Sequence, residues 1–324
     1  MKIGRNFTNT LIPEVLTSEQ REKVFSGETD LFSMNAIGIM EFKKDVLFQL
    51  QAASKLGLDW LELDCDIPNP YLDFSKDQCQ QIKSRAEELS IDLSTHLSYT
   101  GVGGEVSNIQ EYERSLVVEL HKKYIDFAQN IGAKTCVMHP GKAPFYFISP
   151  VFLQKLESAL IDTLKVLIPY AAENGIKFHI ENNVSFDNIY WQTRDVLRIM
   201  DKLREEGLQE VYFNFDIGHW FTRAEKNVAI PEDCLEDLHK IPPEFVYELH
   251  LNDYVPKKII FHPPLIETPG FLKQEVLKRY FDILKNELKP EVVVLETAFK
   301  TAHQLENRWK LLEEETAYIR GFLS

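Results

Sequence analysis

Cysteine is scarce in this sequence, and its few positions form no metal-binding or disulfide pattern. The four cysteines, Cys65, Cys79, Cys136 and Cys234, include no C-x-x-C pair and no dense framework. Zinc knuckles and small disulfide-stabilised scaffolds need such spacing. The sequence therefore predicts reduced thiols in a cytosolic setting and no cysteine-based metal site.

Long apolar runs and an excess of basic residues are also missing. The N-terminal segment MKIGRNFTNT has no apolar stretch of the signal-peptide kind, and no run approaches the roughly 18 apolar residues of a membrane helix. We therefore expect a soluble, cytoplasmic protein with no membrane partner. Acidic residues outnumber basic ones by 50 to 36, which gives a formal net charge of -14. Because such a field repels polyanions, nucleic acid is the less favoured partner.

Several signatures of common enzyme classes are absent. No G-x-G-x-x-G follows an early strand-like run, and the glycine cluster GVGGEV at 101–106 lacks the strand–turn–helix context of a dinucleotide site. The nucleophile elbow G-x-S-x-G is missing too. No Gly-, Ser- or Pro-rich linker divides the chain. The sequence therefore argues against a doubly wound nucleotide-binding fold, a serine hydrolase and a two-domain protein.

What the sequence does contain is a regular alternation of strand-like and helical segments. Short runs rich in Val, Ile and aromatic residues are separated by longer amphipathic segments, which is typical of βαβ units around a parallel sheet. Seven such runs are clear, at 58–64, 91–97, 133–139, 176–182, 211–217, 245–251 and 291–297. An eighth must precede residue 58, and of the segments 2–7 and 33–39 we favour the first.

Eight βα units in one uninterrupted chain describe a TIM barrel. We therefore predict the α/β class, with a single (β/α)8 barrel domain over residues 1–324. The segments 98–110, 141–150 and 254–272 are longer than typical connections and follow the carboxyl ends of predicted strands. In a barrel such loops extend the C-terminal face, where active sites are built.

Polar side chains stand at or near the ends of six consecutive predicted strands. They are His96, His139, Glu181, Asp216, His250 and Glu296. Successive positions are 43, 42, 35, 34 and 46 residues apart, which is the length of one βα unit, so a barrel brings them together at its mouth. Burying the three carboxylates without a counter-ion is costly, whereas a cation removes that cost. The pattern predicts a divalent-metal site.

Other polar residues are interpreted from their positions. His262 lies in the long loop after the seventh strand and is predicted to contact substrate. Lys142 directly follows the segment MHPG and is placed to meet an anionic group, although a solvated loop lysine is the commoner case. His179 lies one layer deeper than Glu181 and is interpreted either as a core residue or as one that supports the metal ligands from behind. Three more histidines fall in helical segments and are predicted at the surface, namely His121, His239 and His303.

The polar strand ends belong to an ordered set of short motifs. These are STH ending at His96, MHPG with His139, HIEN with Glu181, FDIGH with Asp216 and His219, ELHLND with His250 and Asp253, and VLET with Glu296. On these motifs, from about the second strand to the eighth, the chain resembles the xylose isomerase-like TIM barrel superfamily. That superfamily includes the AP endonuclease family 2 proteins and the sugar phosphate isomerase-epimerase group.

The resemblance implies a metal-dependent isomerase or epimerase of a sugar or sugar derivative. In such enzymes Glu, Asp, His and Glu from strands five to eight hold one Mn, Co, Mg or Zn ion. The matching ligands in this chain are Glu181, Asp216, His250 and Glu296. The resemblance also implies that Glu181 and Glu296 form the acid/base pair that moves a substrate proton through an enediolate. The predicted substrate contacts are His96, His219, His262 and Lys142. The identity of the sugar and assembly into a homo-oligomer are left open.

The endonuclease IV branch of the superfamily is the alternative. Its zinc phosphodiesterases act at abasic DNA sites with three metal ions, and the resemblance implies additional ligands at His96, His139 and His219. The third zinc of that branch also needs an Asp-x-His pair in the loop after strand seven. Ile260 stands two residues before His262 here, and this departure, together with the acidic balance, favours the isomerase.

Overall fold

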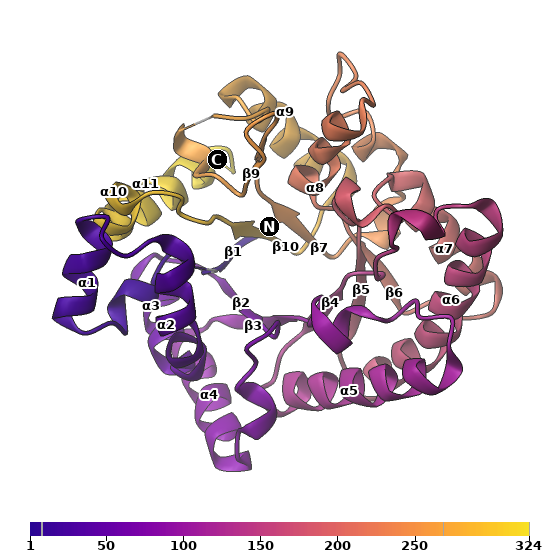
Figure 1. Ribbon diagram of the computed structural model, residues 1–324, viewed down its shortest axis with the longest axis horizontal. Helices are drawn as coiled ribbons and strands as arrows, with labels where there is room; N and C mark the ends of the chain where they lie inside the picture. The colour runs from indigo at the N-terminus through magenta and orange to yellow at the C-terminus, as the bar shows by residue number, and fades with distance from the viewer. Residues whose placement is uncertain (8, 268, 324) are drawn as a thin grey trace.

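The computed structural model contains a nearly closed barrel of eight parallel strands inside a ring of helices (Figure 1). It describes residues 1–7, 9–267 and 269–323. The barrel strands are β1 (Lys2–Asn6), β2 (Trp60–Asp64), β3 (Asp92–His96), β4 (Thr135–Met138), β5 (Lys177–Glu181), β6 (Val211–Asn214), β7 (Glu248–Leu251) and β10 (Val292–Glu296). The predicted fold class is thereby confirmed.

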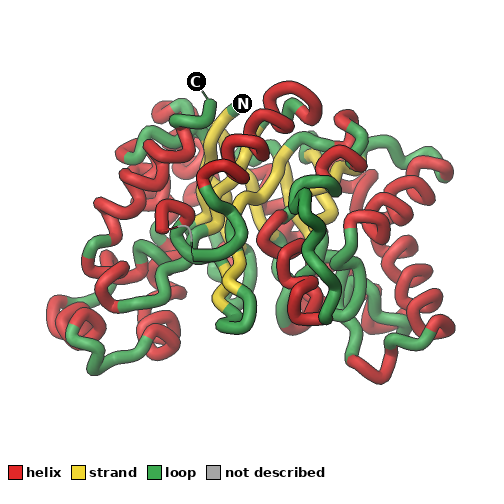
Figure 2. Tube along the Cα trace, turned by 90° about the horizontal axis from the view of Figure 1, so that it is seen from above, coloured by secondary structure: helices red, strands yellow, loops and turns green. Residues whose placement is uncertain are grey.

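The helices cover the outer face of the strands. They are α1 (Ser18–Phe25), α2 (Leu31–Lys44), α3 (Val46–Lys55), α4 (Lys76–Leu89), α5 (Glu111–Asn130), α6 (Pro150–Glu173), α7 (Thr193–Glu205), α8 (Ile217–Phe221), α9 (Gln274–Ile283), α10 (Ala302–Glu306) and α11 (Arg308–Arg320). Figure 2 shows the strands in the middle, both chain ends at one end of the barrel, and long loops at the other. Among the described helices, none is long and apolar enough to span a membrane.

The strands pair in the order β6-β5-β4-β3-β2-β1-β10-β7, so that β6 and β7 are the two edges of the sheet. Register places Asn6 beside Glu296 and Asp64 beside His96 at the carboxyl ends. The two edges meet through a side chain, since the backbone N–H of His250 donates to Oδ1 of Asn214 at 2.8 Å. This side-chain bond joins the edge strands β6 and β7, which are not paired with each other in the sheet.

The composition of each element follows from the surfaces that it buries. All five residues of β10, with the sequence VVVLE, are buried, because the barrel interior covers one face and the helices cover the other. Helix α7 buries a single stripe formed by Val196, Ile199, Met200 and Leu203. That spacing of three and four residues is the one that places apolar side chains on one helical face. The apolar periods read from the sequence thus correspond to real packing faces.

The two uncertain strand assignments have clear outcomes. Residues 2–7 do supply the first strand, whereas residues 33–39 lie within α2, which Asp30 starts by accepting the N–H of Ser33 at 2.8 Å. The run at 211–217 is strand only as far as Asn214. Asp216 instead caps α8, because its Oδ1 accepts the N–H of His219 at 2.7 Å.

One histidine lies elsewhere than predicted. His121 was expected at the surface, but it is fully buried on the inner side of α5. Its Nε2–H donates to the carbonyl of Gly103 at 2.8 Å, and burial lowers its pKa to about 4. The prediction was wrong because the loop 98–110 folds over α5 and supplies a carbonyl acceptor there. His239 and His303 are exposed, in agreement with the prediction.

Candidate active site and metal centre

The carboxyl ends of four neighbouring strands bring the predicted metal ligands together. Glu181 ends β5, His250 lies in β7, Glu296 ends β10, and Asp216 stands between β6 and α8. One ligand atom from each of the four lies within 4.8 Å of those of the other three. All four side chains are buried. We call this group the mouth cluster.

Imidazoles surround the Glu181 carboxylate on several sides. Its Oε2 lies 3.1 Å from Nε2 of His96 and 3.3 Å from Nε2 of His139. Its Oε1 lies 3.1 Å from Nδ1 of His219 and 3.3 Å from Nδ1 of His250. The predicted additional ligands His96, His139 and His219 therefore lie at the same site, and Glu181 is its centre.

Hydrogen bonds on the far side of three rings fix where their protons lie. His96 donates from Nδ1 to the carbonyl of Leu97 at 3.0 Å. His139 donates from Nδ1 to Oδ1 of Asn183 at 3.0 Å. His250 points its Nε2 at Glu62, 3.1 Å away, and donates there. A neutral imidazole carries one proton, so in their neutral forms these rings turn a lone pair toward Glu181; in its protonated form His96 donates from Nε2 to Oε2 of Glu181 at 3.1 Å.

This donor set fits a divalent cation. Lone pairs of imidazole nitrogens that face a carboxylate at 3.1–3.3 Å repel it unless a positive charge lies between them. Neither Oε1 of Glu181 nor Nδ1 of His250 makes a hydrogen bond with any residue that the structure describes, although both are buried. Buried polar atoms are nearly always satisfied, so two unsatisfied ligand atoms side by side indicate a place for an ion. Mixed imidazole and carboxylate donors suit Zn, Mn, Co and Mg.

The protonation of the site shows the same need for positive charge. Burial, with repulsion from Glu181 and Glu62, raises the pKa of Glu296 to about 8. Burial also opposes ionisation of Glu181, but the imidazoles of His139 and His250 outweigh it and hold its pKa well below the ordinary range. The pKa of His96 is lowered by burial and raised more strongly by Glu181, to about 10. Without an ion, bound protons thus supply the charge that the carboxylates require.

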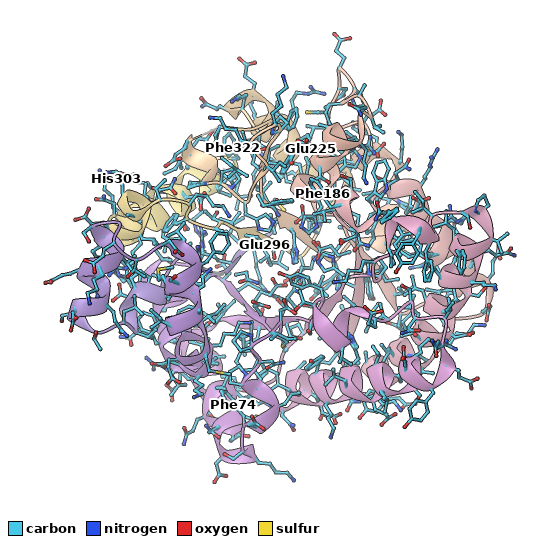
Figure 3. The ribbon with its side chains drawn as sticks, viewed as in Figure 1. Phe74, Phe186, Glu225, Glu296, His303 and Phe322 are labelled. Carbon is cyan, nitrogen blue, oxygen red and sulfur yellow. The ribbon has the colours of Figure 1, made fainter. Side chains whose placement is uncertain are left out.

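A cavity of about 380 Å³ opens above the mouth cluster. It is lined by all four predicted substrate contacts, His96, His219, His262 and Lys142, and by Glu296. Figure 3 shows Glu296 near the centre of the strand ring. His262 reaches inward from the loop after β7, so that its Nδ1 lies 3.8 Å from Oε2 of Glu296. The volume lies within the range of small-molecule sites.

Sequence reasoning missed three residues that belong to this site. Glu62 in β2 is buried and accepts from Nδ2 of Asn6 at 3.1 Å as well as from His250. Asn252 donates to Oδ2 of Asp216 and, at 3.3 Å, to Oε2 of Glu296. Lys300 lines the cavity, and burial lowers its pKa to about 8. Glu62 carried a readable signal, because it is an acid within an apolar strand, as Glu181 is.

The glycine of the motif FDIGH also has a structural reason. A Cβ placed on Gly218 would collide with Oδ1 of Asn252, so a larger residue would displace the amide that holds Asp216. Asp253 of the motif ELHLND has a different role, since its carboxylate accepts backbone N–H groups of Tyr254, Phe271 and Leu272. It organises the loop after β7 rather than the metal ligands. That loop contains the short hairpin β8 (Tyr254–Val255) and β9 (Ile260–Phe261).

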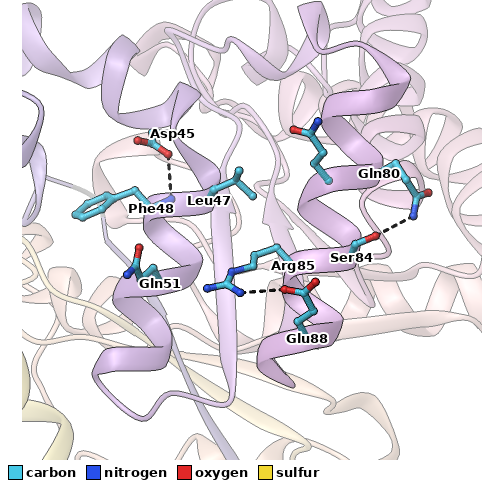
Figure 4. Close-up of a pocket in the computed structure, with 9 residues that line it drawn as sticks. Asp45, Leu47, Phe48, Gln51, Gln80, Ser84, Arg85 and Glu88 are labelled. Carbon is cyan, nitrogen blue, oxygen red and sulfur yellow. Dashed lines mark hydrogen bonds and ion pairs between the residues drawn. The ribbon is translucent and has the colours of Figure 1, made fainter.

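Another hollow lies outside the barrel mouth, and no histidine lines it. It measures about 640 Å³ and lies between α3 and α4, outside the barrel (Figure 4). Several of its polar side chains bind each other or the backbone: Arg85 pairs with Glu88 at 2.9 Å, and Asp45 caps the N–H of Phe48 at 3.0 Å. The barrel mouth is therefore the candidate active site.

Comparison with known proteins agrees with this architecture. The model of the family described as "Xylose isomerase-like TIM barrel" matches residues 50–317. The chain belongs to this family. A curated family relative, an uncharacterized protein of Methanocaldococcus jannaschii named MJ1614, is 26% identical over 168 residues. That match covers 52% of this chain and 58% of the relative, so the chain spans little more than half the length of the protein it matches.

Solved structures with the same barrel include sugar epimerases. D-psicose 3-epimerase from Clostridium cellulolyticum has a TM-score of 0.63 at 13% identity, and the alignment covers 86% of this chain and 92% of that one. The 3-keto-D-glucoside 4-epimerase of E. coli has a TM-score of 0.61 at 18% identity, with coverage of 86% and 94%. At such low identity these likenesses establish the barrel fold of the family and leave the activity of this chain to its own site.

Proposed function

We propose that this chain is a divalent-metal-dependent isomerase or epimerase of a sugar or sugar derivative. One observation carries the proposal: two buried glutamates from β5 and β10, Glu181 and Glu296, have carboxylate oxygens within 4.8 Å of each other beneath a cavity lined by polar side chains. Proton transfer at carbon needs a base to remove the proton and an acid to return it. The sugar epimerases that share the barrel add support at the level of the superfamily.

The mouth cluster would hold the ion through Glu181, Asp216, His250 and Glu296. A divalent cation bound there would polarise oxygens of the substrate and so acidify the neighbouring C–H bond. Asn252 would keep Asp216 and Glu296 in place, since its amide donates to both carboxylates. Glu62 would hold His250 with Nδ1 turned toward the ion.

The remaining cavity residues would bind the sugar. His96, His219, His262 and Lys142 all line the same space. Such groups bind hydroxyl oxygens and fix which carbon faces Glu181 and Glu296. In this scheme Glu181 and Glu296 exchange the substrate proton, and the histidines orient the substrate.

A zinc phosphodiesterase acting at abasic DNA sites is the second candidate. It is favoured by one observation, that ligand atoms of His96, His139 and Glu181 form a further group within 4.8 Å, beside the mouth cluster. Against it stands Ile260 in β9, because an aliphatic side chain supplies no ligand where a third zinc site would need a carboxylate. The net charge of -14 also opposes binding of a polyanion.

Metal content and one substitution test the proposal. We expect one tightly bound ion per chain by elemental analysis, and turnover on a panel of ketoses and aldoses that depends on this ion. Glu181→Gln should remove turnover and weaken metal binding, because it deletes a ligand and an acid/base group together. Wild-type turnover in this variant would contradict the mechanism.

The same experiment separates the two candidates. Three zinc ions per chain, with nicking of an abasic duplex that His262→Ala abolishes, would replace the isomerase by the phosphodiesterase. A thermal melt of each variant shows whether it has folded. His239→Ala serves as the histidine control, because His239 is exposed and pairs with Glu287 far from the mouth.

A further inference from the structure

A second cavity lies directly beside the active-site cavity. It measures about 450 Å³ and is formed by the loops that follow β3, β4 and β5. Lys142 and Asp187 line both cavities, so the two spaces adjoin at these side chains. Phe186 of the second cavity also lies edge-on to Phe261 of the first, with ring centroids 5.9 Å apart. We call this second space the outer cavity.

The walls of the outer cavity are braced against one another. Gly141, at φ +87°, lets the loop after β4 approach Ser107 so closely that a Cβ there would strike the hydroxyl. The N–H of Ala143 donates to the carbonyl of Asp187 at 2.9 Å, and Nδ2 of Asn188 donates to the carbonyl of Ala143 at 2.8 Å. These contacts link all three loops, so the cavity is preformed rather than dependent on a ligand.

The lining combines apolar surfaces with neutral polar groups. Phe186 is 41% exposed and Ile109 is 38% exposed, which leaves large apolar side chains uncovered in a concave place. Phe147 is half-buried, and its ring stacks on that of Phe152 with the ring centroids 4.5 Å apart. Asn108 and Gln110 line the same wall, where Nδ2 of Asn108 donates to Oε2 of Glu113 at 2.7 Å and the amide of Gln110 supplies a further polar group. An aromatic platform beside amide groups suits a sugar ring, which has apolar C–H faces and a rim of hydroxyls.

The charge of the outer cavity limits the class of ligand that it can bind. Three acidic side chains line it, Glu105, Glu113 and Asp187, against the single cation Lys142. An anionic substituent such as a phosphate would meet net repulsion there. A neutral group meets no such repulsion. The cavity therefore selects against sugar phosphates and nucleotides and accepts an uncharged polyol.

We infer that the outer cavity is a subsite for a second, uncharged sugar residue, so that the substrate is a disaccharide or another glycoside whose reacting sugar lies over Glu181 and Glu296. This inference rests on the proposed function for the reacting sugar. It adds the class of substrate to the proposed function, because a free monosaccharide would occupy the active-site cavity and leave the outer cavity without a ligand.

Binding measurements on the metal-loaded protein test the subsite. Isothermal titration calorimetry would compare glucose, galactose, mannose and fructose with maltose, cellobiose, lactose and sucrose. At least one disaccharide should bind about tenfold more tightly than either of its monosaccharides. Phe147→Ala should weaken binding of that disaccharide about fivefold, which is the effect expected from loss of one aromatic contact, and should leave monosaccharide binding unchanged.

Phe145→Ala is the matched control. Phe145 belongs to the same turn, is 76% exposed and does not line the outer cavity, so its loss should change neither affinity. Disaccharides that bind no more tightly than monosaccharides would overturn the subsite, as would tightest binding by glucose 6-phosphate. Equal losses in Phe147→Ala and Phe145→Ala would overturn it too. Turnover is scored separately, because a sugar that binds with the expected ratio but is never isomerised contradicts the proposed function and not the subsite.

Discussion

Two acid-containing clusters are buried in the same barrel, but only one of them is satisfied by its own hydrogen bonds. Deeper in the barrel, Glu248 accepts the hydroxyl of Ser94 at 3.1 Å on one oxygen and the hydroxyl of Thr135 on the other. Ser94 in turn accepts from Nε1 of Trp60 at 2.8 Å. We call this the floor cluster. In the mouth cluster, Oε1 of Glu181 and Nδ1 of His250 make no hydrogen bond within the described chain.

The difference distinguishes a structural group from a binding site. A buried carboxylate that receives a donor on each oxygen is stabilised in place without a bound ion. A buried carboxylate and imidazole that face each other without a hydrogen bond are stable only when a further charge joins them. Each cluster contains a buried glutamate, Glu248 in one and Glu181 in the other, so the hydrogen bonds that the carboxylate receives, and not the presence of a buried acid, separate the roles of the two clusters.

The largest effect is expected from Glu296→Gln in the mouth cluster. Loss of one acid/base group should lower turnover by about 10²- to 10⁴-fold. The metal-free variant should melt no lower than the wild type at neutral pH, because burial raises the pKa of Glu296 to about 8 and the amide then replaces a largely protonated, uncharged carboxyl group. Turnover with a mixed ketose and aldose panel, together with a thermal melt, measures both quantities.

Glu291→Gln is the matched control for this substitution. Glu291 precedes β10 at the opposite end of the barrel, is 42% exposed and pairs with Lys2 at 2.7 Å. Turnover should stay at the wild-type level in the control. If Glu296→Gln retains more than about a tenth of wild-type turnover, Glu296 is a ligand or spectator and the two-glutamate mechanism fails.

An intermediate effect is expected from Glu62→Gln, which alters the carboxylate that holds His250 of the mouth cluster. Glu62 accepts from Nε2 of His250 and Nδ2 of Asn6, so it would act on a bound ion through His250. Partners of this kind typically contribute about 10- to 100-fold to metal affinity. Competition with a chelating dye should show a loss of that size, and turnover should recover when the metal concentration is raised. An unchanged dissociation constant would remove Glu62 from the positioning of His250.

Most of the fold and much of the mouth cluster were predictable, and particular residues show why. The strand ends at His96, Glu181 and Glu296 are separated by whole βα units, and barrel geometry converts that spacing into proximity. The protein's hydrogen bonds were not predictable in this way. Glu62 and Glu248 both occur inside apolar strands, but their partners come from strands far away in the chain.

Loops limited the prediction further. His121 was misplaced because the carbonyl that it binds, on Gly103, belongs to an irregular segment whose path has no period in the sequence. The outer cavity is likewise formed by three loops, and its walls meet only through contacts such as that of Gly141 with Ser107. Periodicity reports the faces of helices and strands, and it carries no information about how loops cross one another.

The smallest effect on the metal is expected from Thr135→Val in the floor cluster. This variant tests whether the floor cluster is independent of the metal ligands in the mouth cluster. Val keeps the shape of Thr but leaves one oxygen of Glu248 without its donor. An unsatisfied buried acceptor should lower the free energy of unfolding by about 1–3 kcal/mol.

Thr95→Val is the control for this substitution. Thr95 is equally buried in the neighbouring strand, and its hydroxyl makes no hydrogen bond with the described residues, so loss of the hydroxyl should leave the free energy of unfolding unchanged. Metal stoichiometry and affinity should be unchanged in both variants. A weaker metal site in Thr135→Val would mean that the floor cluster, through Glu248 and His250, helps to hold the ion, and the separation of the two clusters would then be wrong.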